Sequence, residues 1–213
     1  MSISEVPVAG ADAVIAVKPD VVASVLPVLG RHDVPRVLSI AAGVRCAAIE
    51  ADLPDGTPVV RCMPNTPALV GQGAAAIAAG TTATDADLAW ARGILAAVGV
   101  VVTVAESELD AVTGLSGSGP AYVFALAEAM TAAGIAQGLE PSTADALTRQ
   151  TLYGAAALLV ESGDDPAQLR RNVTSPGGTT AAGLAVLDAA GFGALIDQVI
   201  SAATERSREL GGS

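Results

Sequence analysis

The residue types best suited to chemistry gather in one short stretch, 172–180, which reads Asn-Val-Thr-Ser-Pro-Gly-Gly-Thr-Thr. Pro176 fixes its own φ angle, and the two glycines after it tolerate positive φ and leave no side chain in the way. One of the two closing threonines, Thr179 or Thr180, can cap a helix that begins near Ala181. Backbone N–H groups at the start of a helix stabilise an anion. The stretch therefore indicates either a tight turn between helices, the commoner case, or an anion-binding loop.

The elements that must position this stretch change in type along the chain. Up to about residue 105, short runs rich in Val, Ile and Ala alternate with helical patterns. The apolar runs span residues 13–17, 36–40, 58–62, 74–79 and 100–104, and the helical patterns span 21–29, 44–51 and 85–98. Strands separated by short helices predict an open α/β sheet.

The first three apolar runs end in loops of small or polar residues. These loops are Lys18-Pro19, Ala41-Ala42-Gly43 and Met63-Pro64-Asn65. In open α/β sheets ligands bind at the carboxyl ends of the strands, so the three loops predict a second candidate site. Lys18 is the one charge that the first run places there, and it suits either a ligand contact or a solvated strand end.

From Glu106 onward the pattern is wholly helical. The expected helices span residues 106–113, 121–136, 142–161, 166–171 and 181–190, and a last one ends near 210. The change near Ala105 predicts an α/β domain at 1–105 and an all-α domain at 106–213. Aromatic residues make up only 2% of the sequence, so small aliphatic side chains must build the core, which suits helices that interleave closely in an assembly.

Composition and charge exclude several classes of function. The net charge of −11 argues against nucleic-acid or anionic-membrane partners. Because this charge repels anions, any anionic ligand must be bound by local backbone N–H groups. The sequence shows no secretory signal pattern, and its longest apolar run, 93–105, is too short to span a bilayer. Cys46 and Cys62 suit a reducing compartment and are too few for a metal site. Together these features predict a soluble cytoplasmic protein without a metal ion.

The segment 114–119 holds glycines in the pattern Gly-x-x-Gly-x-Gly but follows no strand. It therefore fails as a dinucleotide-binding fingerprint and instead predicts a place where two helices, or a helix and a ligand, approach closely. A β-hydroxyacid dehydrogenase would carry a catalytic lysine four residues after the last glycine. Val123 occupies that place, so the chain has no evident base there for a hydroxyl proton.

Longer segments also stand out: Ala-Val-Lys-Pro at 16–19, Ser-Ile-Ala-Ala-Gly at 39–43, Cys-Met-Pro-Asn-Thr-Pro at 62–67, and the segments 110–122 and 173–180. In this order they resemble pyrroline-5-carboxylate reductases, and the last two are the most specific for that family. The resemblance implies an oxidoreductase that reduces 1-pyrroline-5-carboxylate to L-proline with NADPH or NADH, the last step of proline biosynthesis. It also implies an incomplete Rossmann-like parallel sheet followed by a helical dimerisation domain, in a homodimer or a larger ring of dimers.

The resemblance also implies roles for individual residues. The cofactor would contact Val17, Lys18, Pro19, Ala41, Ala42, Met63, Asn65 and Asn172. The substrate would contact Glu106, Ser118, Gly178, Thr179 and Thr180. Loop N–H groups would hold the substrate carboxylate, and Thr180 would act in catalysis by hydrogen-bonding the ring nitrogen. A cyclic imine can take its proton from water, so the reaction needs position and complementary charge, which Glu106 would supply, more than a strong base.

The sequence departs from the family pattern at its beginning. The family starts with a strand and a Gly-x-Gly-x-x-Gly turn that cradles the cofactor pyrophosphate, and this sequence has no such turn. A start site assigned too late and a shortened chain both account for the difference. The chain as given is therefore expected to bind nicotinamide cofactor weakly or not at all. A catalytically silent dimerising protein, a binding protein for proline-like carboxylates and a β-hydroxyacid dehydrogenase relative are the alternatives.

Overall fold

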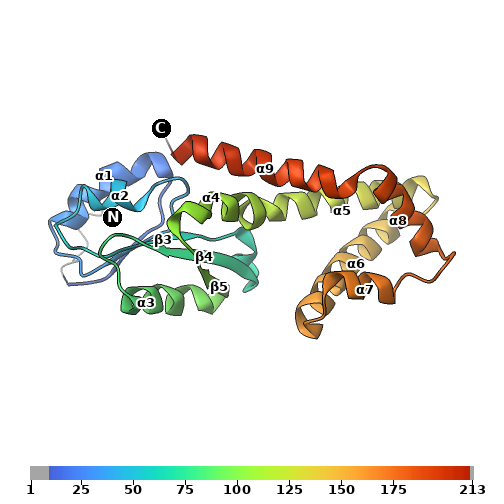
Figure 1. The fold of residues 1–213 in the computed structure, drawn as a ribbon, viewed down its shortest axis with the longest axis horizontal. Coiled ribbons are helices and arrows are strands. Elements are labelled where there is room, and N and C mark those ends of the chain that lie inside the picture. Colours follow the sequence, from blue (N-terminus) through green and yellow to red (C-terminus); the bar gives the residue numbers. More distant parts are fainter. Residues whose placement is uncertain (1–9, 212–213) are drawn as a thin grey trace. The chain divides into compact units, whose positions relative to one another are not determined.

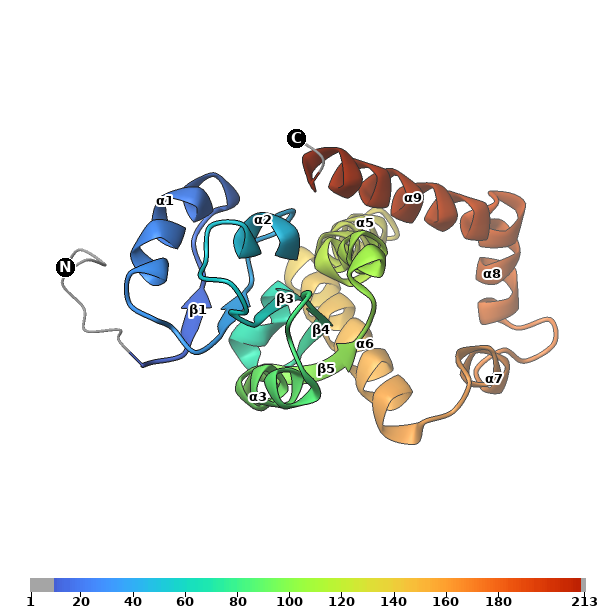
Figure 2. The same cartoon turned by 60° about the vertical axis from the view of Figure 1, so that its left-hand side comes forward.

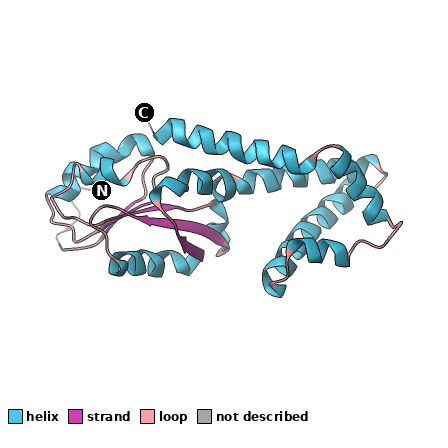
Figure 3. Cartoon of the chain, in the orientation of Figure 1, coloured by secondary structure: helices cyan, strands magenta, loops and turns pink. Residues whose placement is uncertain are grey.

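The computed structural model describes residues 10–211. They divide into two compact units, which we call the sheet unit and the helical unit (Figure 1). The sheet unit comprises residues 10–120 and 199–211, and the helical unit comprises residues 121–198. The described strands all lie in the sheet unit (Figure 3). This division by packing is separate from the boundary near residue 105, which follows the sequence pattern and stays a prediction.

A mostly parallel sheet forms the centre of the sheet unit. Its strands, in spatial order, are β1 (Ala13–Ile15), β2 (Val37–Ser39), β3 (Val59–Met63), β4 (Gly73–Ala79) and β5 (Gly99–Thr103). β1, β2 and β3 run parallel, β4 runs antiparallel to β3, and β5 runs parallel to β4. The reversal follows a connection that holds only the 3-10 turn Thr66–Val70, too short for the helical crossover that a parallel pair needs. The predicted α/β sheet is confirmed, with one change of strand direction.

Helices cover both faces of this sheet (Figures 1 and 2). One face carries α1 (Pro19–Gly30), α2 (Cys46–Glu50) and α4 (Leu109–Val112), and the other carries α3 (Asp85–Leu95).

The strand side chains alternate between these two layers, as the geometry of a strand requires. Val37 and Val59 pack with α1 and α2, whereas Leu38 and Val60 pack with α3. Arg61 follows Val60 and therefore shares the face of Val59. A charged side chain thus lies in the layer that α2 and α4 cover.

Two glycines in the 114–119 segment allow neighbouring elements to pack closely against it. α4 continues through a π-helical turn, Thr113–Gly117, into α5 (Gly119–Ala136). A Cβ atom at Gly114 would collide with Thr204 on α9 (Phe192–Gly211), and one at Gly117 would collide with Met63. The prediction of a close approach at this segment is confirmed, because here the glycines admit a helix on one side and a strand end on the other.

The helical unit is built from α5, α6 (Pro141–Ser162), α7 (Pro166–Asn172), α8 (Thr179–Ala189) and the first turns of α9. Gly178 is the N-cap of α8, so the predicted capping by Thr179 or Thr180 is wrong. The helix begins two residues earlier than the apolar pattern suggested, because Gly178 adopts the extended conformation that a cap needs and its carbonyl accepts the Ala182 N–H at 3.1 Å. Both threonines therefore lie in the first helical turn.

The helical stretch Glu106–Ala136 is long and apolar enough to cross a membrane, by length and composition alone. None of its most apolar window is buried within the described chain. A helix surface that another protein chain covers can have the same apolar composition. Length and composition therefore do not decide between a membrane and a protein interface. The absence of a membrane partner stays a prediction.

Candidate active site

The carboxyl ends of β1 and β2 bring the first predicted loops together. Lys18 is the N-cap residue of α1, and the Ile40 N–H donates to the Ile15 carbonyl at 3.0 Å, so the two strand ends stay in register. Pro19 and Ala42 line one cavity of about 530 Å³ at this edge, together with the C-terminal end of α9. Gly43 has a φ of 77°, which only glycine adopts readily, and it lies against Leu210. A small-residue loop thus lines a cavity at the predicted edge.

Asn65 joins this edge to the π-helical turn. Its Nδ2 donates to the Ser116 carbonyl at 3.1 Å, and its Oδ1 accepts the Ala74 N–H at 2.8 Å. One side chain therefore ties the end of β3, the start of β4 and the Thr113–Gly117 turn together. Met63 packs against Gly117, directly before Ser118. The structure therefore gathers Met63, Asn65 and the region of Ser118, and it gives Asn65 a structural task that the sequence did not predict.

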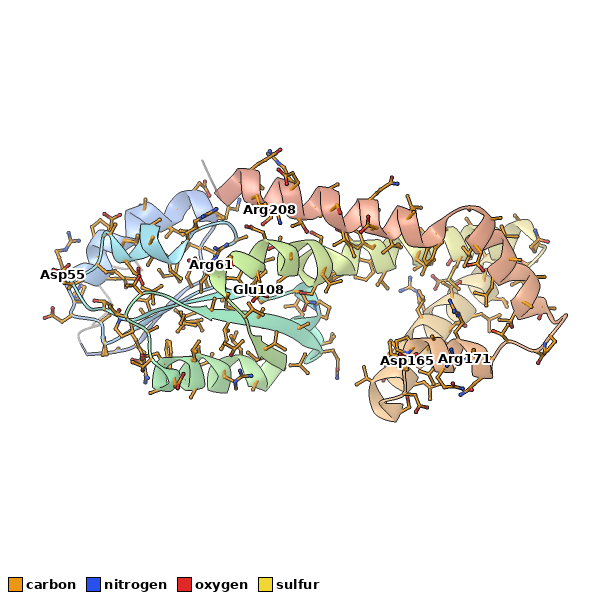
Figure 4. All side chains as sticks on the ribbon, in the orientation of Figure 1. Asp55, Arg61, Glu108, Asp165, Arg171 and Arg208 are labelled. Carbon is orange, nitrogen blue, oxygen red and sulfur yellow. The ribbon has the colours of Figure 1, made fainter. Side chains whose placement is uncertain are left out.

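Glu106 is held by two donors from separate elements. Its Oε1 accepts the Cys46 N–H at 2.7 Å and Arg61 Nη1 at 3.1 Å. The side chain of Arg61 is only 8% exposed, and that of Glu106 is 30% exposed. Figure 4 shows Arg61 on the side of the sheet where α2 and α4 lie. An ion pair that the sequence did not reveal therefore anchors a predicted substrate residue.

This environment keeps Glu106 ionised. Partial burial by itself raises the pKa of Glu106, but the hydrogen bonds from the Cys46 backbone and from Arg61 outweigh it and hold the pKa below its ordinary value. A carboxylate in this state offers a fixed negative charge near neutral pH and no proton to donate. It fits a role in stabilising a cation rather than a role as general acid.

The two cysteine thiols are poor nucleophile candidates. Burial raises the pKa of Cys62 to about 12. Burial also raises the pKa of Cys46 to about 12, and the nearby Glu106 charge adds to the shift. Since the thiolate is the reactive form, neither side chain suits covalent catalysis.

Of the predicted residues not yet placed, Val17 lies between β1 and α1 and is 37% exposed, and Asn172, Gly178, Thr179 and Thr180 lie in the helical unit. Asn172 ends α7, and its Oδ1 accepts Gln168 Nε2 at 2.7 Å. The stretch then turns through Gly177, whose φ is 71°, and leads into the first turn of α8 with Gly178, Thr179 and Thr180. The N–H groups of a first helical turn have no intrahelical acceptor, so this turn can hold an anion. The arrangement suits the carboxylate role that the sequence predicts, and that role stays a prediction.

The loop after β2 fits the nicotinamide half of a nicotinamide dinucleotide cofactor. The small side chain of Ala42, the positive φ of Gly43 and the adjoining cavity leave room for a flat ring beside the strand ends, whereas Ala41 is buried. Within residues 10–211 no glycine-rich turn joins a strand to a helix, because the glycines at 114–119 lie inside helical turns. The fit therefore covers the nicotinamide side and offers no cradle for the pyrophosphate.

Fold and site define the class of oxidoreductases in which a Rossmann-like sheet precedes a helical dimerisation domain. A family model described as pyrroline-5-carboxylate reductase dimerisation matches residues 106–210. A pyrroline-5-carboxylate reductase from Pseudomonas aeruginosa is 48% identical over 95% of this chain and 76% of its own length. One from Synechocystis sp. is also 48% identical, over 92% of this chain and 74% of its own length.

Solved structures agree with these relatives. The Coxiella burnetii pyrroline-5-carboxylate reductase has a TM-score of 0.91 and 38% identity, covering 95% of this chain and 77% of that one. The Plasmodium falciparum pyrroline carboxylate reductase, solved with NADP bound, has a TM-score of 0.87 and 32% identity, covering 99% of this chain and 81% of that one. The chain belongs to the pyrroline-5-carboxylate reductase family.

Proposed function

We propose that this protein reduces 1-pyrroline-5-carboxylate to L-proline with NADPH or NADH, the last step of proline biosynthesis. The observation that carries the proposal is the 48% identity to the Pseudomonas aeruginosa reductase, which extends over 95% of this chain and so includes the strand-end loops and the 172–180 stretch. The Plasmodium falciparum relative with NADP bound supports the choice of cofactor class. A silent dimerising protein and a β-hydroxyacid dehydrogenase relative are not favoured by these comparisons.

The sheet unit would bind the nicotinamide side of the cofactor. When bound, NADPH or NADH supplies the hydride. The backbone and side chains after β1, β2 and β3 would orient its ring. The residues proposed for this role are Val17, Lys18, Pro19, Ala41, Ala42, Met63, Asn65 and Asn172.

The first turn of α8 would bind the substrate. Its N–H groups would hold the carboxylate, and Thr180 Oγ1 would accept a hydrogen bond from the protonated ring nitrogen. Glu106 would favour the iminium form through its charge, while the proton comes from water. Thr179 would act mainly through its backbone N–H, and Gly178 and Ser118 are the other residues proposed to contact the substrate.

The proposed assembly is a homodimer, with larger rings of dimers as a further step. The dimerisation family model covers 106–210, and the helices in that range expose large apolar side chains. We place the protein in the cytoplasm, with no nucleic-acid or membrane partner, because of its net charge of −11 and its biosynthetic relatives.

The test is oxidation of NADPH and NADH, supplied at high concentration because the described residues offer no pyrophosphate cradle, by the purified protein with and without added 1-pyrroline-5-carboxylate. The proposal predicts oxidation only with the imine, and L-proline formed in equal amount. A 3-hydroxyacid with the oxidised cofactors serves as the control substrate and should give no reaction. Binding of L-proline without any turnover would instead support the binding-protein alternative, and neither binding nor turnover would support the silent dimerising protein.

A further inference from the structure

Arg61 is a charged side chain in the middle of a buried strand. It lies on β3 between Val60 and Cys62, both essentially unexposed, and is itself 6% exposed. Its register partners are Ser39 on β2 and Ala78 on β4, neither of which carries a charge. Placing a guanidinium in such a layer is unfavourable unless a partner and good hydrogen bonds compensate. The chain therefore needs a specific reason to keep a charge at this point.

Glu106 is the partner that compensates the Arg61 charge. Its Oε1 accepts hydrogen bonds from Arg61 Nη1 at 3.1 Å and from the Cys46 N–H at 2.7 Å, and the Cys46 thiol also hydrogen-bonds to the carboxylate. The side chain is still 30% exposed, so part of the carboxylate is open to water or a ligand. The carboxylate is thus held in place and remains partly accessible.

The same contacts fix the loop after β2 at both ends. Ser39 Oγ accepts the Ala41 N–H at 3.3 Å, at the start of the loop. Glu106 accepts the Cys46 N–H at its end, where α2 begins. The loop between them contains Ala41 and Ala42, which the proposed function places against the nicotinamide ring. Moving Glu106 would therefore disturb both a charge and a cofactor-binding loop.

We propose that Arg61 is a positioning residue for imine reduction: it fixes the Glu106 carboxylate so that Oε1 anchors the loop after β2 and the exposed part of the carboxylate faces a cationic substrate group. This inference rests on the proposed function. Arg61 touches neither substrate nor cofactor in this account and acts through Glu106 alone. The charged and titratable groups that act on Glu106 are Arg61 from β3 and the Cys46 thiol from α2, and Glu50 acts on that thiol in turn.

The direct test is a ¹³C NMR titration of the Glu106 carboxyl group in the unmodified protein, Arg61→Met and Arg61→Lys. The signal is identified by its loss in Glu106→Gln. We expect Glu106 to titrate at higher pH in Arg61→Met, and Arg61→Lys to restore most of the difference. The matched control is Arg36→Met, which removes an arginine paired with Asp12 at 3.0 Å and stacked on Trp90, and it should leave the Glu106 titration unchanged.

Kinetics then separate positioning from a general loss of structure. Arg61→Met should lower kcat/KM for the imine by up to about a hundredfold, as expected for a misplaced catalytic group. The acid limb of the kcat/KM pH profile of Arg61→Met should move to higher pH. In the double variant Arg61→Met/Glu106→Gln, kcat/KM should be little lower than in Glu106→Gln alone, because Arg61 acts through Glu106. Losses that simply add, or an unchanged Glu106 titration in Arg61→Met, would overturn the proposal.

The two proposals fail in different ways. If the unmodified protein shows no imine-dependent oxidation, the proposed reaction is wrong, and the positioning role that rests on it falls as well. If the unmodified protein is active and Arg61→Met keeps full activity with an unchanged pH profile, only the positioning role is wrong. Arg61→Met is expected to fold, because an apolar side chain of similar length suits the buried layer and the partly exposed Glu106 can be hydrated.

Discussion

The sheet unit and the helical unit bury their apolar side chains to very different extents. In the sheet unit, Val37, Leu38, Val59, Val60 and Ile77 are completely buried. In the helical unit, the buried residues among those described are Ala144 and Thr148, whereas large side chains stay open: Phe124 is 62%, Tyr153 71% and Val160 81% exposed. The sheet unit therefore contains its own core, and the helical unit presents apolar surface that only another surface can cover.

The difference in burial indicates which unit is stable by itself and which needs a partner. Burying a large aliphatic side chain stabilises a fold by about 1.5–3 kcal/mol, so a unit that buries almost none cannot offset its loss of conformational entropy. The helical unit includes a groove of about 630 Å³ between α5 and α6, lined by Val123, Phe124, Ile135 and Leu152 among others. In the proposed dimer, this surface takes its missing core from the second copy, as the match to the dimerisation family implies.

The largest effect should come from a charge placed in that groove. Phe124→Asp should dissociate the dimer and reduce the helix content of residues 121–198, because an unpaired carboxylate would have to be buried at the interface. Light scattering coupled to size exclusion and far-UV circular dichroism measure both changes. The matched control is Leu69→Asp, a side chain that is 89% exposed in the sheet unit and lies outside the family match. If both variants stay dimeric, the groove is not the interface.

A smaller but still large effect should follow from a cavity in the sheet unit. Ile77→Ala on β4 should lower the free energy of unfolding by about 2–5 kcal/mol, since the side chain is completely buried. Urea unfolding followed by Trp90 fluorescence measures it, and the loss should be the same at every protein concentration. Ile94→Ala, at a position 42% exposed on α3, should cost less than about 1 kcal/mol. A concentration-dependent loss for Ile77→Ala would contradict a self-contained core.

Thr180→Ala tests whether the helical unit carries the substrate contact while the sheet unit carries the cofactor contact. We expect kcat/KM for the imine to fall roughly ten- to a hundredfold, the effect of losing one hydrogen bond to a charged group, with the KM for NADPH little changed. Thr179→Ala is the control and should have little effect, because its backbone N–H is kept. An unchanged kcat/KM in Thr180→Ala would remove Thr180 from the site.

Most of the fold could be predicted from the sequence, because the information was local. Val-rich and Ala-rich runs marked every strand of the sheet to within a few residues, and the helical pattern after Glu106 marked the helices of the second half. The direction of β4 could not be predicted, since it depends on the compact turn at Thr66–Val70 rather than on the strand itself. The N-cap of α8 was missed because Gly178 offers no side-chain oxygen to signal it.

The candidate site was less accessible to sequence reasoning. Arg61 and Glu106 are 45 residues apart, and only folding brings β3 and the 3-10 turn Glu106–Glu108, just before α4, within hydrogen-bonding distance. A charge inside the run Val-Val-Arg-Cys-Met was the one available signal that β3 serves more than packing. The two hydrogen bonds of Asn65 were also hidden, because both partners are backbone groups.

The smallest predicted effect concerns acid stability. The pKa of Glu106 is lowered in the folded protein, so its contribution to stability is present above the unfolded pKa and is lost as the pH falls through the folded pKa. Glu106→Gln should therefore flatten the acid side of the stability curve of the sheet unit. It should also cause a modest loss of stability near neutral pH, because Gln can still accept the Cys46 and Arg61 hydrogen bonds but no longer balances the buried Arg61 charge. Melting temperatures at a series of pH values measure it, and an unchanged acid slope would show that the ion pair contributes nothing.

Hydrogen exchange at two protein concentrations tests the contrast between the units most directly. On dilution below the dissociation constant of the dimer, the backbone amides of α5 and α6 should exchange much faster, because their core is supplied by the second copy. The amides of β2, β3 and β4 should keep the same protection at both concentrations. Equal protection of α5 and α6 at all concentrations would contradict the account, since it would mean that the helical unit is stable without a partner.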